Sequence, residues 1–257
     1  MTAGATHQRI RVATYNIHKC RGLDRRVRPQ RIVEILRELD ADVIALQEVL
    51  SLPGKSLDED HAGFIAAELG LRLGFGENRR LGGRVYGNAL LARFPLRVVS
   101  NHDLTAHGRE PRGCLHVDVE LPGGALLHVF NVHLGTAFLE RRHQARKLIS
   151  AEILRQSHLQ GPRIVLGDFN EWSRGLTTQL LRAHFSTPDL RVHLNRSRTY
   201  PGVLPLLHLD HIYFDASLRL DRLTLHRNRR SLLASDHLPL VADLSLATDN
   251  AHETSAA

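Results

Sequence analysis

The stretch RIVLGDFNEW, residues 163–172, restricts the folds open to this chain. Its first four residues form an apolar run of β-forming type, which predicts a buried strand. A buried strand normally ends in turn residues, but this one leads through Gly167 to Asp168 and Asn170. In open α/β sheets, ligands bind at the carboxyl ends of the strands. We therefore expect a sheet that carries a polar site at this end.

The same pattern, an apolar run that ends in an acid, an amide or a histidine, recurs along the chain. Six predicted strand ends carry such residues: Asn16, Glu48, Asn131 with His133, Asp168 with Asn170, Asp210, and Asp236 with His237. Each of them alone is explained as well by a helix cap, a surface charge or a hydrogen-bonded histidine. Strand ends at one sheet edge converge in space, however, and carboxylates that converge need a cation. Together they predict a site of metal-assisted chemistry.

The pattern of strands and helices predicts a mixed α/β chain rather than a regular βαβ series. The expected hairpin has arms at 114–121 and 125–134, around the turn Pro122–Gly124. The segment from Phe138 to Leu159 is predicted to be the longest helix. No segment resembles a linker, so we expect one domain over residues 9–247, with flexible polar tails at 1–8 and 248–257.

Composition limits the classes of protein that fit. The chain has 257 residues, 42% of them hydrophobic, which supports a sizeable core. No apolar run reaches the length of a membrane span and no secretory signal is evident, so we expect a cytoplasmic protein. Cys20 and Cys114, the only cysteines, are then expected to be free thiols.

The net charge of +7 admits a polyanionic partner or substrate, although an arginine-rich, GC-rich coding bias explains it as well. Aromatic residues make up only 5% of the chain, which weakens the case for a surface that stacks nucleic-acid bases.

The donor set at the strand ends indicates which metal to expect. Carboxylate and amide oxygens without thiolates favour Mg²⁺ or Mn²⁺ over Zn²⁺. Mg²⁺ typically relies on one or two carboxylates together with a phosphate of the substrate, so we expect a phosphoester substrate. The histidines would then supply acid–base groups or hydrogen bonds to the phosphate near neutral pH.

Seven motifs occur in an order that resembles the endonuclease/exonuclease/phosphatase superfamily: TYNIH (14–18), LQEV (46–49), GNALLARFP (87–95), NVHLG (131–135), GDFNEW (167–172), LDHIYF (209–214) and SDHLPL (235–240). They extend over about residues 10–246. The resemblance implies the DNase I-like fold, a four-layered α/β sandwich in which two mixed β-sheets pack face to face with helices outside. It also implies divalent-metal-dependent hydrolysis of phosphoesters. The chain is most similar to small intracellular bacterial members.

The resemblance assigns Glu48 as the principal ligand of Mg²⁺ or Mn²⁺, with Asn16 and Asp236 nearby. The catalytic side chains that it implies are His133, Asp168, Asn170, Asp210 and His237. Asp168 would orient or activate the attacking water, or bind a second metal.

Two of the remaining catalytic side chains, Asn170 and His133, would donate to the scissile phosphate. His237 would be the other catalytic histidine, with Asp210 as the carboxylate that fixes its tautomer and orientation. The resemblance leaves open whether His237 is the base or stabilises the transition state.

Two residues are candidates for substrate binding, Asn88 and Arg112, although a surface role is the favoured interpretation of Arg112. The basic residues Arg141, Arg142 and Arg146 of the predicted helix are expected on a solvated face, with contact to an anionic membrane or a nucleic acid as the alternative.

The function that these observations favour is a phosphodiesterase that uses in-line attack by a metal- or Asp-activated water. Two alternatives stay open: an endonuclease acting on DNA or RNA, and a non-catalytic binding module of the same fold. The substrate, a lipid headgroup, a nucleotide or a nucleic acid, is not indicated because specificity lies in variable loops.

Overall fold

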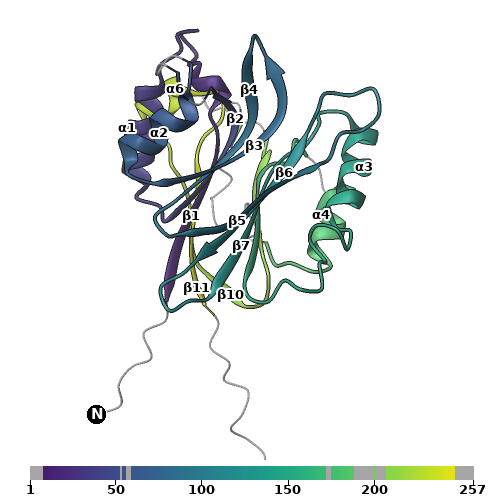
Figure 1. Ribbon diagram of the computed structural model, residues 1–257. Coiled ribbons are helices and arrows are strands. Elements are labelled where there is room, and N and C mark those ends of the chain that lie inside the picture. Colours follow the sequence, from purple (N-terminus) through teal and green to yellow (C-terminus); the bar gives the residue numbers. More distant parts are fainter. Residues whose placement is uncertain are drawn as a thin grey trace, which may run out of the picture.

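Two mixed β-sheets pack face to face, and helices cover their outer faces (Figure 1). The computed structural model describes residues 8–52, 54–55, 59–171, 175–187, 199–200 and 207–246. The strands are β1 (Arg9–Asn16), β2 (Val43–Ser51), β3 (Arg72–Leu81), β4 (Arg84–Ala92), β5 (Leu96–Asp103), β6 (Gly113–Glu120), β7 (Leu126–His133), β8 (Arg163–Asp168), β9 (Asp210–Phe214), β10 (Leu218–Leu225) and β11 (Leu240–Leu246). The helices are η1 (His18–Cys20), α1 (Pro29–Leu39), α2 (His61–Leu69), α3 (Phe138–Leu148), α4 (Leu176–Arg182) and α6 (Arg229–Ala234).

The order of the strands brings chemically active strand ends together. The first sheet has the order β10-β11-β1-β2-β4-β3, and the second has the order β5-β6-β7-β8-β9. The pairs β1–β2 and β7–β8 are parallel, and the other pairs are antiparallel. The carboxyl ends of β1 and β8 meet at one end of the sandwich, where Asn16 donates a hydrogen bond to Asp168.

The core lies between the sheets and is built from the apolar residues that alternate along each strand. Val12 and Val43 of the first sheet and Val129 and Leu166 of the second are completely buried in it. Burying one such side chain stabilises the fold by about 1.5–3 kcal/mol. This core sets the spacing of the sheets and thereby the position of the strand ends.

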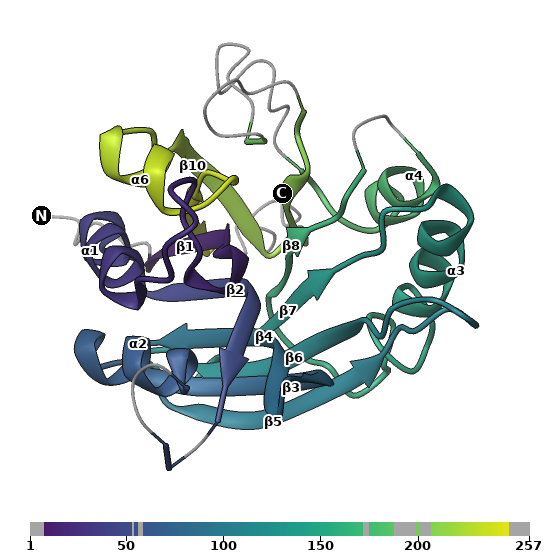
Figure 2. The ribbon, with the colours of Figure 1, turned by 90° about the horizontal axis from the view of Figure 1, so that it is seen from above.

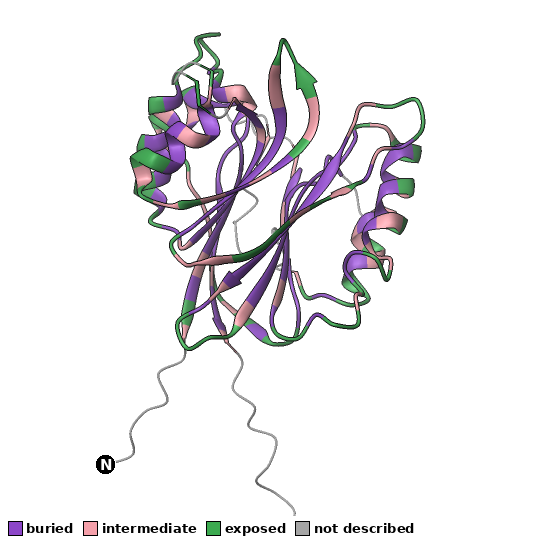
Figure 3. Ribbon diagram, viewed as in Figure 1, coloured by how far each residue is buried: buried purple, intermediate pink, exposed green. Residues whose placement is uncertain are grey.

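The outer layers follow from amphipathic helices. Pro29 begins α1, and its apolar residues at helical spacing, from Ile32 to Leu39, pack on the first sheet. Helices α3 and α4 cover the second sheet, so that exposed residues face away from it (Figure 3). The predicted four-layered α/β sandwich is confirmed.

The predicted hairpin is confirmed, since β6 and β7 pair in antiparallel register from Cys114↔Val132 to Glu120↔Leu126. Gly123 and Gly124 have φ values of 97° and 86°, which side chains disfavour and glycine adopts without strain. Cys20 and Cys114 are both free and buried, as predicted.

The predicted helix from Phe138 to Leu159 is wrong in its length. Helix α3 ends at Leu148, and residues 149–160 form turns. The hydroxyl of Ser150 accepts a hydrogen bond from the Glu152 N–H, a local bond that competes with the helical pattern. Ile153 and Leu154 then pack into the core beneath the helix.

Most of the predicted tails lie outside the described residues. Gln8, predicted to be part of the N-terminal tail, instead continues the sheet because its carbonyl accepts a hydrogen bond from Leu246. Among the described helices, none has the length and apolar character needed to cross a membrane.

A buried ionic cluster lies on the outer face of the second sheet, away from the strand ends described above. Asp118 Oδ1 lies 2.8 Å from His116 Nε2 and 2.6 Å from His128 Nδ1. The other ring nitrogen of His128 is 2.9 Å from the carbonyl oxygen of Gln160. Because both ring nitrogens of His128 face acceptors, the folded protein favours its imidazolium form. Burial lowers the pKa of His128, but its hydrogen bonds to Asp118 and Gln160 outweigh burial and raise the pKa overall.

The substitution His128→Leu should destabilise the protein by about 3 kcal/mol at pH 6, because it leaves Asp118 buried without this partner. The loss should shrink as the pH rises. Because the pKa of His128 is raised in the folded protein, its contribution to the free energy of unfolding is complete at a pH below its pKa in the unfolded chain, about 6.5. That contribution disappears as the pH rises through the pKa of His128 in the folded protein. Asp118, whose pKa is lowered by its two histidines despite burial, stays ionised across this range.

Urea unfolding of the wild type and of His128→Leu between pH 6 and pH 9.5 measures the difference, with the exposed residue change His158→Leu as the control. A difference that does not vary with pH would contradict the ionic account of this cluster.

Candidate active site

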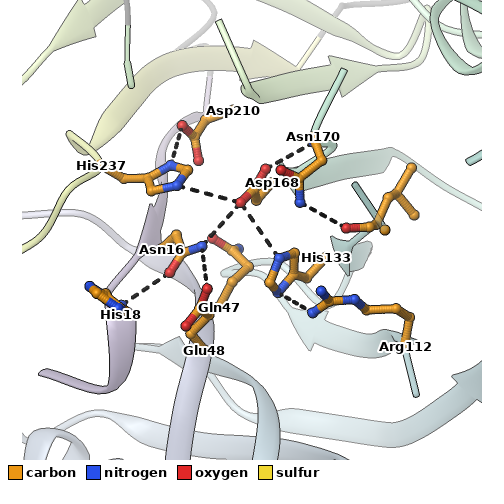
Figure 4. A network of polar contacts seen from close by, with 12 residues as sticks. Asn16, His18, Gln47, Glu48, Arg112, His133, Asp168, Asn170, Asp210 and His237 are labelled. Carbon is orange, nitrogen blue, oxygen red and sulfur yellow. Dashed lines mark hydrogen bonds and ion pairs between the residues drawn. The ribbon is translucent and has the colours of Figure 1, made fainter. Parts of the chain in front are cut away.

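Asp168, the last residue of β8, lies at the centre of the converging strand ends (Figure 4). Its Oδ2 accepts a hydrogen bond of 3.0 Å from Asn16 Nδ2 and lies 3.6 Å from Nε2 of both His133 and His237. Its Oδ1 accepts from the Asn170 backbone N–H at 2.9 Å. Burial raises the pKa of Asp168 to about 6, with a further contribution from Asp210.

His237 is held by Asp210, which is paired with Asp168 across β8 and β9. His237 Nδ1 lies 2.9 Å from Asp210 Oδ2, so the carboxylate accepts the Nδ1 proton and fixes the ring. Burial lowers the pKa of His237, but the carboxylates of Asp210 and Asp168 outweigh it and raise the pKa to about 10. The ring of Tyr200 lies beside this histidine, with centroids 4.8 Å apart.

His133, the last residue of β7, has its tautomer fixed by Arg112. Arg112 Nη1 lies 3.1 Å from His133 Nδ1, and arginine can only donate, so Nδ1 accepts and Nε2 carries the proton. That Nε2 faces Asp168. Burial and the neighbouring guanidinium lower the pKa of His133 to about 3, which keeps the ring neutral. His133 is therefore a neutral hydrogen-bond donor toward the site.

Arg112 does not lie on the surface, so the surface role is wrong. It is buried, 7% exposed, and its Nη2 donates to Glu110 at 2.9 Å. Its guanidinium also contacts the ring of His133, and its role in substrate binding stays a prediction. The sequence could not show this contact because the loop that precedes β6 has no periodic pattern.

Glu48 reaches the site through a bulge in β2. The pairing of β2 with β4 shifts register between Leu46 and Val49, and Glu48 has a φ of 56°. A left-handed residue that is not glycine costs about 1–2 kcal/mol, and such strain is concentrated at functional sites. The Glu48 carboxylate lies 2.5 Å from Lys19 Nζ and 3.4 Å from Asn16 Nδ2. Burial raises the pKa of Glu48, but the ammonium group of Lys19 outweighs it and lowers the pKa overall.

Asp236 joins the site through His18. Asp236 Oδ1 lies 3.5 Å from His18 Nδ1, and the His18 backbone N–H donates to Asn16 Oδ1 at 3.0 Å. Residues 18–20 have successive φ values of 44°, 56° and 58°, so the chain makes a left-handed turn directly after β1. This turn brings both His18 and Lys19 against the carboxylates. Of the three predicted metal-binding residues, Asn16 and Glu48 contact each other directly. Asp236 contacts His18 instead, and reaches Asn16 only through that residue.

A buried amide network supports the site from between the sheets. Gln47 Nε2 donates to Asn131 Oδ1 at 2.7 Å, which joins β2 of the first sheet to β7 of the second. Asn131 Nδ2 in turn donates to the carbonyls of Leu46 and Ala89. The network fixes the ends of β2 and β7 relative to each other.

Asn88 contacts this network through its amide nitrogen, and its role in substrate binding stays a prediction. Its Nδ2 donates to the carbonyls of Gly113 and Asn131, and the residue is 1% exposed. Asn170 is likewise partly committed, since its Nδ2 donates to the Leu134 carbonyl at 2.8 Å. Both amides hold backbone segments in place around the reacting groups.

The predicted basic face of α3 is wrong for Arg141. This side chain is buried, and its Nη1 donates to the carbonyls of Gly135 and Thr136. It fixes the segment between β7 and the helix. Arg146 is exposed and Arg142 is half-buried.

Several contributors were not predicted from the sequence: His18, Lys19, Gln47 and Tyr200. One feature of the sequence could have indicated Lys19. The chain has only three lysines, and this one directly follows a predicted strand end. Trp172, the last residue of the GDFNEW motif, lies outside the described residues.

The donor set fits a hard divalent cation. Glu48 and Asp168 contribute carboxylate oxygens, and burial raises the pKa of both cysteines, Cys20 and Cys114, so that they stay thiols. Asp210 Oδ1 is buried and has no hydrogen-bond partner in the described part of the chain, so it can face a cation. Ligand atoms of Asp168, Asp210 and His237 also lie within 4.8 Å of one another.

The chain is similar to known proteins over most of its length. Residues 13–237 match the model of the Endonuclease/Exonuclease/phosphatase family. The uncharacterized protein YbhP of Escherichia coli K12 is 32% identical over 248 residues, 92% of this chain and 96% of that protein.

Two solved structures show the same fold. The catalytic domain of human Nocturnin with bound sulfate has a TM-score of 0.71 at 21% identity, covering 93% of this chain and 95% of that one. A mannosyl-6-phosphatase of Bacteroides thetaiotaomicron has a TM-score of 0.72 at 17% identity, covering 91% and 99%. The family match extends over most of the chain and includes the strand ends that form the site. The chain therefore belongs to the Endonuclease/Exonuclease/phosphatase family, whose members typically hydrolyse phosphoesters with the help of divalent metals.

Proposed function

We propose that this protein is a divalent-metal-dependent phosphodiesterase. The observation that carries the proposal is the meeting of a buried carboxylate, Asp168, with two histidines of fixed orientation, His133 and His237, beside the ionised Glu48. This combination supplies a group to activate water, donors to a phosphate and an anion to hold a cation.

The two histidines are suited to bind the phosphate. Each Nε2 lies 3.6 Å from Asp168 Oδ2, which is too long for a hydrogen bond, so neither is committed to that carboxylate. Arg112 and Asp210 hold the opposite ring nitrogens and direct both Nε2 atoms to the same space. Preorganised donors of this kind stabilise the charge that develops on the phosphoryl oxygens.

Asp168 is placed to orient or deprotonate the attacking water. Asn16 and the Asn170 backbone fix both of its oxygens. Glu48, with Asn16 beside it and Asp236 at the edge, would hold Mg²⁺ or Mn²⁺. When bound, that cation neutralises charge on the phosphoryl and leaving oxygens.

A nuclease is the second candidate, because the net charge of +7 suits a phosphate backbone. The similarity of this fold to a mannosyl-6-phosphatase shows that the fold does not decide the substrate. Incubation with plasmid and with single-stranded oligonucleotides distinguishes the two, since a nuclease degrades them and the phosphodiesterase that we propose leaves them intact.

The purified protein should hydrolyse bis-p-nitrophenyl phosphate. EDTA should abolish the activity, and Mg²⁺ or Mn²⁺ should restore it. His237→Ala or Asp168→Asn should each lower kcat by about 10²-fold or more, the usual effect of losing a positioned acid–base group. The exposed change His158→Ala serves as the control. Full activity in both site variants would contradict the proposed reaction centre.

Arg112→Met should lower kcat by about 10-fold or more and change KM little, because the guanidinium orients His133 rather than the substrate. Arg79→Met is a matched control, since Arg79 pairs with the same Glu110 at 2.6 Å. Steady-state kinetics on the same diester separates the two parameters. A rise in KM at unchanged kcat would show instead that Arg112 binds the substrate directly.

A further inference from the structure

The exposed apolar side chains of this protein are not spread evenly. Eight large hydrophobic residues of the described chain are exposed: Leu23, Val27, Leu81, Val98, Val99, Phe138, Leu139 and Leu233. Val98 and Val99 lie on β5, an edge strand of the second sheet. The other six lie in segments that adjoin the active-site end of the sandwich, and each segment also carries arginine.

The first apolar–basic segment is the loop 21–28 together with α6. The backbone N–H of Leu23 donates to the Leu233 carbonyl at 3.0 Å, so these two exposed leucines lie side by side, with Val27 in the same loop. The loop sequence RGLDRRVR has four arginines and a single acid. That acid, Asp24, is held by Arg31 through hydrogen bonds of 3.0 and 2.7 Å. The loop is therefore both apolar and strongly cationic.

The second segment is the beginning of α3, which directly follows β7 and His133. Phe138 is 57% exposed and Leu139 is 73% exposed. The guanidinium of Arg142 lies over the Phe138 ring, 5.7 Å from its centroid, and Arg146 is exposed one turn further along. Two large apolar side chains thus project from the beginning of α3, with the guanidinium of Arg142 beside them and Arg146 in the last turn of the same helix.

The third segment is the tip of the hairpin between β3 and β4. Leu81 is 40% exposed next to Arg80, whose side chain is 72% exposed. The tip lies beyond the end of β2, because Ser51 at the end of β2 pairs with Val85 near the start of β4.

These three segments lie on different sides of the active-site end of the molecule. Viewed from above in Figure 2, α6 lies on one side of the molecule, α3 lies on the opposite side, and β3 and β4 lie between them. The carboxyl ends of β1, β7 and β8, which carry the site residues, lie at this same end of the molecule. A surface that contacted all three segments would therefore lie across the end of the molecule that holds these strand ends.

We propose that this end of the protein docks on an anionic lipid bilayer, and that the phosphoester it hydrolyses belongs to a phospholipid headgroup. The second part rests on the proposed phosphodiesterase function. The leucines and phenylalanine would enter the boundary between headgroups and acyl chains, while the arginines contact the lipid phosphates.

Exposed aliphatic side chains favour a bilayer over a nucleic acid. Leucine and valine cannot stack on bases, and proteins that bind single strands do so with aromatic platforms. Phe138 is the only aromatic residue among the eight exposed side chains. Arginine alone fits either polyanion, but arginine interleaved with leucine fits the surface of a membrane.

Cosedimentation with vesicles tests the docking separately from catalysis. The wild type should bind vesicles of phosphatidylcholine with about one third phosphatidylglycerol, and bind pure phosphatidylcholine at least about 10-fold more weakly. The double change Leu23→Ser/Leu139→Ser should weaken binding to the anionic vesicles by about 10-fold or more. The matched control is Val98→Ser/Val99→Ser, which removes two side chains that are 44% and 46% exposed from outside this face.

Turnover then tests the substrate. The Leu23→Ser/Leu139→Ser variant should retain wild-type hydrolysis of bis-p-nitrophenyl phosphate and lose about 10-fold or more on phospholipid in vesicles. Vesicle binding without hydrolysis of either substrate would overturn the proposed function and support the docking surface. Equal binding by both double variants, no vesicle binding by the wild type, or tighter binding to an oligonucleotide than to vesicles would each overturn the docking proposal.

Discussion

The hydrogen bond from Asn16 to Asp168 joins the last residue of β1 in the first sheet to the last residue of β8 in the second. It places a buried carboxylate at the junction of the two sheets, where like charges are expensive unless they are compensated. The surrounding groups provide that compensation. Lys19 pairs with Glu48, Asp210 holds a cationic His237, and Arg112 lies behind His133. The packed core between the sheets makes this meeting point rigid, because it fixes how far apart the two strand ends lie.

Much of this arrangement could be predicted from the sequence, because a β-strand shows its burial and its end directly in the order of its residues. Asn16, His133, Asp168 and Asp210 each end or begin a strand, as the apolar runs indicate. The details that orient these groups are not periodic and were missed. The left-handed φ of Glu48 depends on a bulge between β2 and β4. The contact of Arg112 with His133 joins a loop to a strand end 21 positions away in sequence.

The same limit explains why the apolar part of the proposed membrane-contacting surface could not be predicted, although the sequence offered membrane contact by Arg142 and Arg146 as an alternative. Its pieces are single leucines and a Phe-Leu pair in segments as distant as residues 23, 81, 139 and 233, and none forms an apolar run. Only the fold brings these exposed side chains to the same end of the molecule. In the proposed docking, the exposed apolar side chains contact the bilayer while the buried polar residues form the site. A lipid phosphate at the bilayer surface would then face Asp168, His133 and His237.

Calorimetric titration with Mn²⁺ tests the central claim, that the carboxylates at the sheet junction hold a divalent cation. The wild type should bind Mn²⁺, and Glu48→Gln should weaken the binding by about 10-fold or more because the amide keeps the shape of the side chain and removes its charge. His128→Leu, which alters the separate buried cluster, should leave the affinity unchanged. Equal Mn²⁺ affinity in the wild type and in Glu48→Gln would contradict the account.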